Sequence, residues 1–266
     1  MDNQFRTKKP KLEDYLIRYS ENKTLLKKQG DVFSIPKIAD FYNDIQEFKG
    51  HYLFSIDESA YFLDESKVFD AHPVNFEFVV NRSFRTLPNR LERLGGATAA
   101  HLAHWESLNQ FCGRCGTTMN YGTTERSLVC PHCKNTVYPR ISPVVIVAVE
   151  NGNELLMAKN LDNPNPRLFL ISGFVEIGES LEQAASREVF EETGIHIKNI
   201  KYFGSQPWPF SDALIAGFTA ELDGKSDIKI DTNELATALW VHRNDIPPYE
   251  TDVSISCCLI EKFRRQ

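Results

Sequence analysis

The chain has 266 residues, enough for two domains and a small additional module. Its 42% of apolar and 25% of charged residues are ordinary values for a soluble globular protein, and no apolar run reaches the roughly eighteen residues of a membrane-spanning helix. The net charge of −6 argues against a general nucleic-acid binder, but it leaves open a nucleotide whose phosphates a metal ion neutralises.

The first fifteen residues are polar and lack the apolar core of a signal peptide, so we expect a loose arm ahead of the fold. The last residues match no targeting signal. Both features favour a cytoplasmic protein, in which the six cysteines are not expected to form a disulfide framework.

The region up to about Asn109 alternates short β-like runs with polar turns. Residues 51–56 and 76–80 predict strands, and residues 97–108 predict a helix, because Leu102, Trp105 and Leu108 recur at helix spacing. His101 and His104 lie on this helix, where packing or surface exposure is favoured over a role as metal ligands.

The region after Tyr138 starts with a run of β-branched residues, 144–149, that suits a buried strand. A second strand, 154–158, follows a turn over residues 151–153. A helix, a β segment and a C-terminal helix complete the region. Cys257 and Cys258 are interpreted as apolar fillers on that last helix.

The other four cysteines form two pairs, Cys112 with Cys115 and Cys130 with Cys133, with fourteen residues between the pairs. This spacing predicts a tetrahedral zinc site, whereas a redox role would need only one pair. Four sulfur ligands leave no open position for catalysis, so the zinc is expected to be structural, one ion per subunit. His132 is expected to be a bystander.

The segment from Gly173 to Ile195 carries the chemistry. Ser180 followed by Gln183 is a capping box, so a helix should begin at Leu181, and Gly194 should end it. An apolar stripe faces a core, and three glutamates share another face: Glu188, Glu191 and Glu192.

Like charges at this spacing destabilise a bare helix. Arg187 neutralises part of the excess, and a divalent cation such as Mg²⁺, which prefers carboxylate oxygens, would neutralise the rest. From the helix alone, a solvated acidic face with surface ion pairs is an equally good interpretation.

The complete pattern runs from Gly173 through Glu179 to Arg187-Glu188-Val189-x-Glu191-Glu192-x-Gly194-Ile195. It resembles the box of the Nudix hydrolases at every defined position. The resemblance implies an α+β fold, a Nudix α/β/α sandwich. It also implies that Glu188 and Glu192 bind Mg²⁺ or Mn²⁺ with the carbonyl of Ser172, that Glu191 assists them or activates water, and that all three glutamates are catalytic. The implied reaction is substitution at phosphorus in a nucleoside diphosphate, in which metal ions screen the charge and lower the pKa of water.

Residues 205–210 read SQPWPF, which taken alone describes a rigid loop with two prolines and inward-packing aromatics. After a Nudix box and a four-cysteine ribbon, the segment resembles the NADH pyrophosphatase subfamily, over about residues 111–266. The resemblance implies a distal metal-binding Glu234 and these substrate contacts: Glu125, Tyr138, Phe174, Gln206, Pro207, Trp208, Pro209, Phe210, Ser211, Asp212, Ala213 and Ser256.

In this interpretation Tyr138 and Phe174 stack on the flat rings of the dinucleotide. One departure concerns Ser211-Asp212-Ala213, where the subfamily often has Pro-x-Ser. A hydroxyl is therefore lost at position 213, although Ser211 could replace it.

The resulting expectation is three domains: an N-terminal mixed α/β domain (1–110), the zinc ribbon (111–139) and the Nudix domain (140–266). The resemblance implies a homodimer that hydrolyses NADH and NAD⁺ to nicotinamide mononucleotide and AMP. Removal of an NAD cap from RNA uses the same chemistry and stays open. ADP-ribose or a diadenosine polyphosphate fits SQPWPF less well, a nucleotide sensor would show a damaged box, and a nucleic-acid-binding ribbon would need more than its three basic residues.

Overall fold

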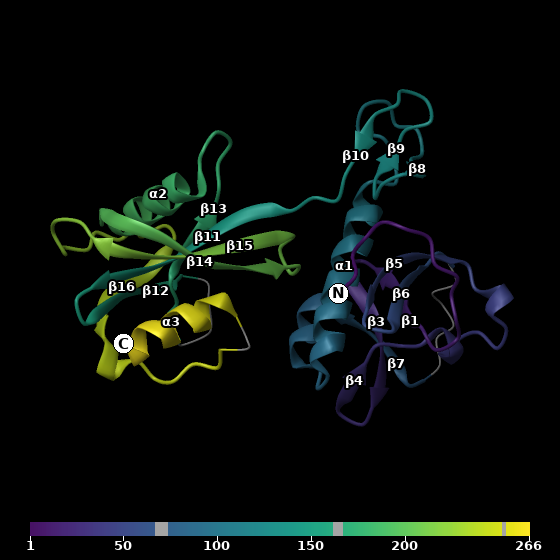
Figure 1. The fold of residues 1–266 in the computed structure, drawn as a ribbon, viewed down its shortest axis with the longest axis horizontal. Helices are drawn as coiled ribbons and strands as arrows, with labels where there is room; N and C mark the ends of the chain where they lie inside the picture. Colours follow the sequence, from purple (N-terminus) through teal and green to yellow (C-terminus); the bar gives the residue numbers. More distant parts are fainter. Residues whose placement is uncertain (67–73, 162–166, 252–253) are drawn as a thin grey trace. The chain divides into compact units, whose positions relative to one another are not determined.

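The chain forms two compact units, Met1–Arg140 and Ile141–Gln266 (Figure 1). This computed structural model describes residues 1–66, 74–161, 167–251 and 254–266. Among these residues, every helix is too short or too polar to span a lipid bilayer.

The first unit contains two small sheets and a long helix. In one sheet β6 (Ser59–Asp64) pairs with β1 (Tyr15–Ile17) and β5 (Gly50–Ile56). In the other, β3 (Lys23–Gln29) pairs with β2 (Tyr19–Ser20), β4 (Val32–Ser34) and β7 (Phe76–Val80). The strands predicted at 51–56 and 76–80 are thus confirmed.

Helix α1 (Arg90–Leu108) is longer than predicted, because it begins seven residues before Ala97. Asn89 caps it by accepting hydrogen bonds from Leu91 and Glu92. Two glycines inside it allow close packing: a Cβ at Gly95 would lie 2.2 Å from the Tyr61 hydroxyl. Leu102 and Trp105 are buried, whereas Leu108, the last residue of the helix, is 67% exposed.

The N-terminal residues are not the loose arm that their polarity suggested. Asp2 forms an antiparallel bridge with Ser55 through two backbone hydrogen bonds of 2.7 and 3.0 Å. Asn3 accepts a hydrogen bond from Arg126. The two histidines of α1, expected to pack or to lie at the surface, are both hydrogen-bonded, His101 with the carbonyl of Arg140 and His104 with the Tyr19 hydroxyl.

The cysteine-rich segment carries β8 (Asn120–Tyr121), β9 (Leu128–Val129) and β10 (Thr136–Val137), which form a three-stranded antiparallel sheet. Trp105 of α1 packs into its small core with Met119 and Leu128. The ribbon is also tied to the N-terminal part of the unit. The Arg126 guanidinium donates to the carbonyl of Leu53, and the Tyr121 hydroxyl donates to Glu106 of α1.

His51 completes this connection. Its imidazole lies between two carboxylates, 2.8 Å from Glu65 and 3.0 Å from Glu106. The ring also packs on Tyr121, with centroids 4.5 Å apart. The Glu106 side chain therefore bonds both a residue of the N-terminal sheet and a residue of the ribbon.

The second unit is built on one mixed sheet. Its strands are β11 (Ser142–Asn151), β12 (Glu154–Asn160), β13 (Ile171–Phe174), β14 (Ile197–Trp208), β15 (Ala213–Leu222) and β16 (Leu235–His242). The order is β14-β15-β11-β12-β16, and β13 pairs with β11. The predicted strands at 144–149 and 154–158 are confirmed, each within a longer strand.

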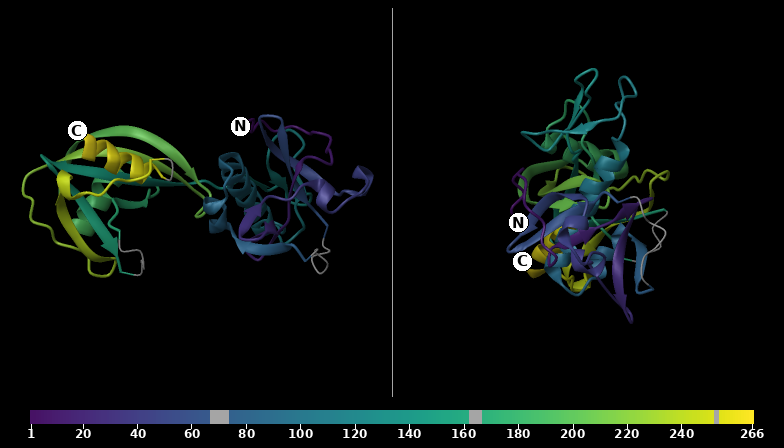
Figure 2. Two further views of the ribbon diagram at one scale, coloured as in Figure 1. Left: turned by 90° about the horizontal axis from the view of Figure 1, so that it is seen from below. Right: turned by 90° about the vertical axis from the view of Figure 1, so that its right-hand side faces the viewer.

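Helices α2 (Leu181–Thr193) and α3 (Ile255–Arg265) cover opposite faces of this sheet (Figure 1). Seen from below, α3 lies in front of the strands (Figure 2). Alternate residues of β11 explain the two layers: Val145, Val147 and Val149 pack with α2, whereas Ile146 and Ala148 pack with α3. The observed arrangement is an α/β/α sandwich.

Helix α2 has the predicted bounds and caps. The Ser180 side chain accepts from the backbone of Gln183, the Gln183 side chain accepts from the backbone of Ser180, and Gly194 adopts the left-handed conformation with φ of 70°. Ala184, Ala185 and Val189 are fully buried against the sheet. The predicted apolar stripe is confirmed.

Two expectations for the end of the chain need correction. Residues 205–208 are not a loop, because they pair in register with β15 as the end of β14. Pro207 is tolerated there since β14 is an edge strand. Cys257 and Cys258 lie on α3 as predicted, but both are only half-buried, and the core face of the helix carries Leu259 and Phe263.

Candidate active site and zinc centre

The carboxylate of Glu188 lies directly against the backbone of Gly173. A Cβ added at Gly173 would lie 2.0 Å from Cδ of Glu188 and 2.1 and 2.2 Å from its two oxygens. Only glycine leaves this space free. Strand β13 and helix α2 are thus packed so that Gly173, the first glycine of the motif, makes room for the carboxylate of Glu188.

Arg187 binds three glutamates of the motif with a fork of hydrogen bonds. It binds both oxygens of Glu179 at 2.6 and 2.9 Å, and Glu188 at 2.8 Å and Glu191 at 2.9 Å. Its Nη2 also donates to the carbonyl of Phe174 at 2.9 Å. The predicted neutralisation by Arg187 is present, and the hydrogen bonds from Arg187 lower the pKa of Glu179 to about 2.

Glu192 is in a different environment from its neighbours. Glu192 as a whole residue is 6% exposed to solvent, whereas the side chain of Glu191 is 58% exposed. Burial, together with the charges of Glu188 and Glu234, raises the pKa of Glu192 to about 8. Within the described part of the chain, no group donates a hydrogen bond to its carboxylate.

Two further predicted metal ligands lie near this face. Ser172 is in β13, opposite Ile146, and directly precedes Gly173. Glu234 is exposed in the turn directly before β16, and its charge contributes to the raised pKa of both Glu188 and Glu192. Among the described residues, the oxygen atoms of these carboxylates do not lie as close to one another as the sulfur atoms of the four cysteines do.

The acidic face fits a divalent cation on physical grounds. A buried, unpaired carboxylate beside other carboxylates is costly, because both desolvation and like-charge repulsion disfavour its ionised form. A hard cation with oxygen ligands relieves both effects. The residues that would hold it are Glu188, Glu192, Glu234 and the carbonyl of Ser172.

We expect Gly173→Ala to destabilise the protein by about 1–3 kcal/mol, since the new methyl group and the Glu188 carboxylate cannot occupy one place. Denaturant unfolding of a double-mutant cycle with Glu188→Ala measures the cause. If the clash is responsible, the cost of Gly173→Ala largely disappears in the Glu188→Ala background. Additive costs would show that the packing interpretation is wrong.

The predicted substrate segment lies at the end of β14 and in the turn that follows. Trp208 and Phe210 pack edge to face, with ring centroids 5.2 Å apart. Gln206 uses its side-chain carbonyl to accept a hydrogen bond of 2.7 Å from the backbone of Ile255. Pro207 is exposed on the edge strand, and Pro209 is half-buried.

The residues after the segment form a tight turn into β15. Ser211 donates its backbone N–H to the carbonyl of Trp208, and Asp212 has a φ of 51°. Ala213 is buried at the start of β15, so a hydroxyl there would lack solvent, whereas Ser211 is exposed. Ser256 is half-buried in the first turn of α3.

In the first unit, the structure brings together Glu125 and Tyr138. The Tyr138 hydroxyl donates to Oε1 of Glu125 at 2.8 Å, and this hydrogen bond raises the pKa of Tyr138. The Tyr138 ring is exposed, as is Phe174 in the second unit. Both rings are therefore free to contact a ligand.

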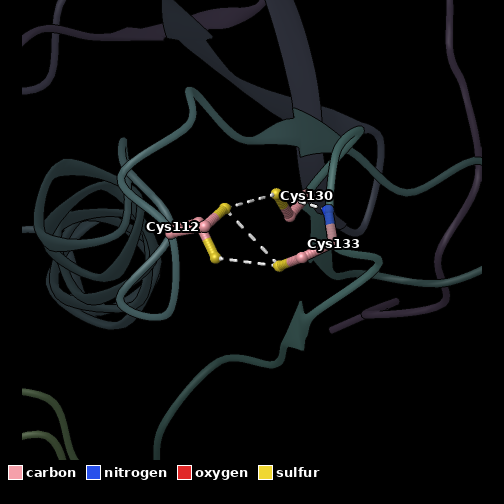
Figure 3. Close-up of side chains that lie close together, drawn as sticks. Cys112, Cys130 and Cys133 are labelled. Carbon is pink, nitrogen blue, oxygen red and sulfur yellow. Dashed lines mark hydrogen bonds between the residues drawn. The ribbon is translucent and has the colours of Figure 1, made fainter.

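The four cysteines form a compact site, and Figure 3 labels three of them, Cys112, Cys130 and Cys133. Their sulfur atoms all lie within 4.8 Å of one another, with separations of 3.5 to 3.6 Å for three pairs. Zinc–sulfur bonds of about 2.3 Å in a tetrahedron place sulfurs about 3.8 Å apart, so the site fits zinc. Backbone N–H groups of Arg114 and Cys133 donate to two of the sulfurs, and His132 is not part of the cluster.

Sequence reasoning gave no role to Glu179, although it holds Arg187 with two hydrogen bonds. Its spacing of eight residues from Arg187 was the available signal. It also missed Asp231, whose charge contributes to the raised pKa of Glu192. No pattern in the sequence connects Asp231 to the glutamate helix.

Comparisons with known proteins agree with this geometry. Residues 139–257 match the NUDIX domain family, and residues 107–138 match the NADH pyrophosphatase zinc ribbon domain family. A crystal structure of a Nudix hydrolase from Nitrosomonas europaea is similar in fold, with a TM-score of 0.50 at 22% identity over 59% of this chain and 90% of that chain. The predicted fold class is confirmed.

Two relatives share more of the sequence. The chain is 42% identical over 160 residues to the NAD-capped RNA hydrolase NudC of Salmonella paratyphi C, which covers 60% of this chain and 62% of that protein. It is 41% identical over 172 residues to the NAD-capped RNA hydrolase NudC of Escherichia fergusonii, covering 65% and 66%. The matched part thus spans just under two thirds of these relatives.

Proposed function

Because residues 139–257 are a Nudix domain and residues 107–138 are an NADH pyrophosphatase zinc ribbon domain, we propose that the protein hydrolyses the diphosphate bond of NADH and NAD⁺. The products are nicotinamide mononucleotide and AMP. The observation that carries the proposal is the Glu188 carboxylate packed on Gly173, beside a buried Glu192 that lacks a hydrogen-bond donor among the described residues.

In this proposal Glu188, Glu192, Glu234 and the carbonyl of Ser172 hold Mg²⁺ or Mn²⁺. The cation, when bound, neutralises the diphosphate and lowers the pKa of the attacking water. Arg187 donates a hydrogen bond to Glu188 and another to Glu191, and its positive charge reduces the repulsion between the two carboxylates. Glu191, which is exposed, accepts the proton as the water oxygen bonds to phosphorus and the bridging oxygen leaves.

The proposal that the substrate is a dinucleotide rests on four aromatic side chains. Aromatic rings offered by Tyr138, Phe174, Trp208 and Phe210 suit the two flat bases of a dinucleotide. The further proposed contacts are Glu125, Gln206, Pro207, Pro209, Ser211, Asp212, Ala213 and Ser256. We also propose a homodimer, by similarity to the subfamily, a cytoplasmic location, and three domains with the bounds given above.

Removal of an NAD cap from RNA is a second candidate. The bond cleaved is the same, and the relatives with 41–42% identity are named NAD-capped RNA hydrolases.

Incubation with NADH, NAD⁺, ADP-ribose and NAD-capped RNA, each with Mn²⁺ and with EDTA, tests the proposal. We expect AMP and reduced nicotinamide mononucleotide from NADH, and no products with EDTA. The ratio of kcat/KM for capped RNA to that for NADH separates the two candidates. A protein that cleaves none of the dinucleotides would contradict both.

A further inference from the structure

Glu125 and Tyr138, two proposed substrate contacts, form a hydrogen bond at the surface of the first unit. The Tyr138 hydroxyl donates to Oε1 of Glu125 at 2.8 Å, and both residues are exposed. Water competes for exposed polar groups, so a hydrogen bond of this kind contributes little net free energy. The orientation of the Tyr138 ring therefore depends on how firmly the backbone holds the two residues.

The two residues come from neighbouring parts of the ribbon. Tyr138 directly follows β10, and Glu125 lies in the turn of residues 122–127 that joins β8 to β9. Since β9 pairs with both β8 and β10, the turn and Tyr138 lie at the same end of the small sheet. A backbone hydrogen bond of 2.8 Å from Gly122 to Ser127 closes the base of the turn, whereas the Ser127 hydroxyl makes only a long bond of 3.5 Å to the carbonyl of Glu125. The ribbon itself thus fixes the base of the turn more firmly than the part that carries Glu125.

Arg126, the next residue of the turn, is bonded to the N-terminal part of the unit. Its guanidinium donates to the carbonyl of Leu53 in β5 and, at 3.0 Å, to Oδ1 of Asn3. The register between β5 and β6 shifts at Leu53, and the extra residue of such a bulge is left out of the ladder, so its carbonyl can accept from an outside donor. Asn3 follows Asp2, which the backbone bridge to Ser55 holds on the same strand. Arg126 therefore ties the turn to β5 and to the segment bridged to it.

A basic residue beside Glu125 could instead contact a phosphate group of a ligand. The contacts favour an anchor, since both terminal nitrogens of Arg126 donate to oxygens of the protein. Burial also lowers the pKa of Arg126, so its guanidinium is partly withdrawn from solvent, whereas Glu125 before it is exposed.

We propose that Arg126 is a positioning residue, which anchors the turn of residues 122–127 on β5 and thereby holds Glu125 against Tyr138, so that the Tyr138 ring keeps one orientation for a base of the dinucleotide. The inference rests on the proposed function, since Glu125 and Tyr138 contact substrate only in that proposal. The N-terminal part of the unit thus shapes the substrate site through a residue that does not itself bind the substrate.

Arg126→Met keeps most of the length of the side chain and removes its donors. We expect a KM for NADH about fivefold higher, kcat within about twofold, and about fivefold faster amide hydrogen exchange over residues 122–127, read by mass spectrometry. Arg126→Lys keeps a charged donor and should recover part of both effects. Unchanged exchange over this turn in Arg126→Met would overturn the inference.

A double-mutant cycle with Tyr138→Phe separates positioning from direct contact with a phosphate. Tyr138→Phe keeps the ring and removes the hydroxyl that bonds Glu125. If Arg126 acts through this hydrogen bond, Arg126→Met should raise KM by less than about twofold in the Tyr138→Phe background. A full fivefold rise in that background would make Arg126 a contact of the substrate and contradict the inference.

Tyr121→Phe is the matched control. It removes another bond between the ribbon and α1, directly before the turn, and leaves Arg126 in place. Exchange over residues 122–127 and KM should stay close to the wild-type values, and effects equal to those of Arg126→Met would mean that the whole ribbon is loosened and that the inference is wrong. Exchange needs no substrate, so it decides whether Arg126 anchors the turn even if the wild-type protein cleaves no dinucleotide and the proposed function fails.

Discussion

Glu192→Gln is expected to lower kcat for dinucleotide hydrolysis by roughly 10²–10³-fold, a loss typical of removing one charge-stabilising group from an active site. The same substitution should stabilise the metal-free protein. Glu192 is buried and lacks a hydrogen-bond donor among the described residues, so its ionised form costs free energy in the folded state that a neutral amide avoids.

The pH dependence of stability follows from the raised pKa. With a folded pKa of about 8 and an ordinary value of 4.5, the folded protein retains a proton that the unfolded chain releases between these limits. The free energy of unfolding of the metal-free protein should therefore fall as pH rises through this window, by up to about 1.4 kcal/mol per pH unit from this group. The contribution levels off above pH 8.

Denaturant unfolding from pH 5 to 8 in EDTA, on the wild-type protein and Glu192→Gln, measures this difference. Glu182→Gln is the matched control, because it removes a carboxylate from the exposed side of the same helix. Adding Mn²⁺ should stabilise the wild-type protein more than Glu192→Gln. Equal pH profiles for the wild-type protein and Glu192→Gln would mean that Glu192 is not the group responsible.

The second large effect concerns zinc. Cys130→Ser should remove the ion and unfold the ribbon, since Cys130 is fully buried and the small core around it contains only a few apolar side chains. Structural zinc sites of this type contribute about 10 kcal/mol or more to folding. Chelation of zinc from the wild-type protein should have the same result.

Zinc content by atomic absorption and tryptophan fluorescence measure the outcome. Trp105 packs in the same cluster as Cys112 and Cys130, so its emission should shift to longer wavelength when the ribbon unfolds. Cys257→Ser is the control, because Cys257 lies on α3 outside the four-cysteine cluster. A ribbon that keeps its structure without zinc would contradict the structural role.

Features with local causes could be predicted from the sequence. The bounds of α2 follow from Ser180, Gln183 and Gly194, each of which acts within one turn of the helix. The cysteine spacing acts over one short segment in the same way. The strand at 144–149 was recognisable because a run of β-branched residues suits burial on both faces.

Features that depend on residues far apart in the sequence could not be predicted in this way. Gly95 and Gly96 look like helix breakers until Tyr61 and Phe84 are known to pack against them. The two prolines of SQPWPF suggested a loop because nothing local reveals the pairing of β14 with β15. The raised pKa of Glu192 depends in part on the charges of Asp231 and Glu234, which lie about forty residues further along the chain.

The hydrogen bonds of Tyr121, Arg126 and His51 have a consequence for protein engineering. A zinc ribbon is often regarded as an exchangeable cassette that can be grafted at its two ends. Here a graft of residues 111–139 would carry Arg126 away from the carbonyl of Leu53 and Tyr121 away from Glu106, and would leave His51 and Trp105 uncovered behind it. The transferable piece is therefore the whole of Met1–Arg140.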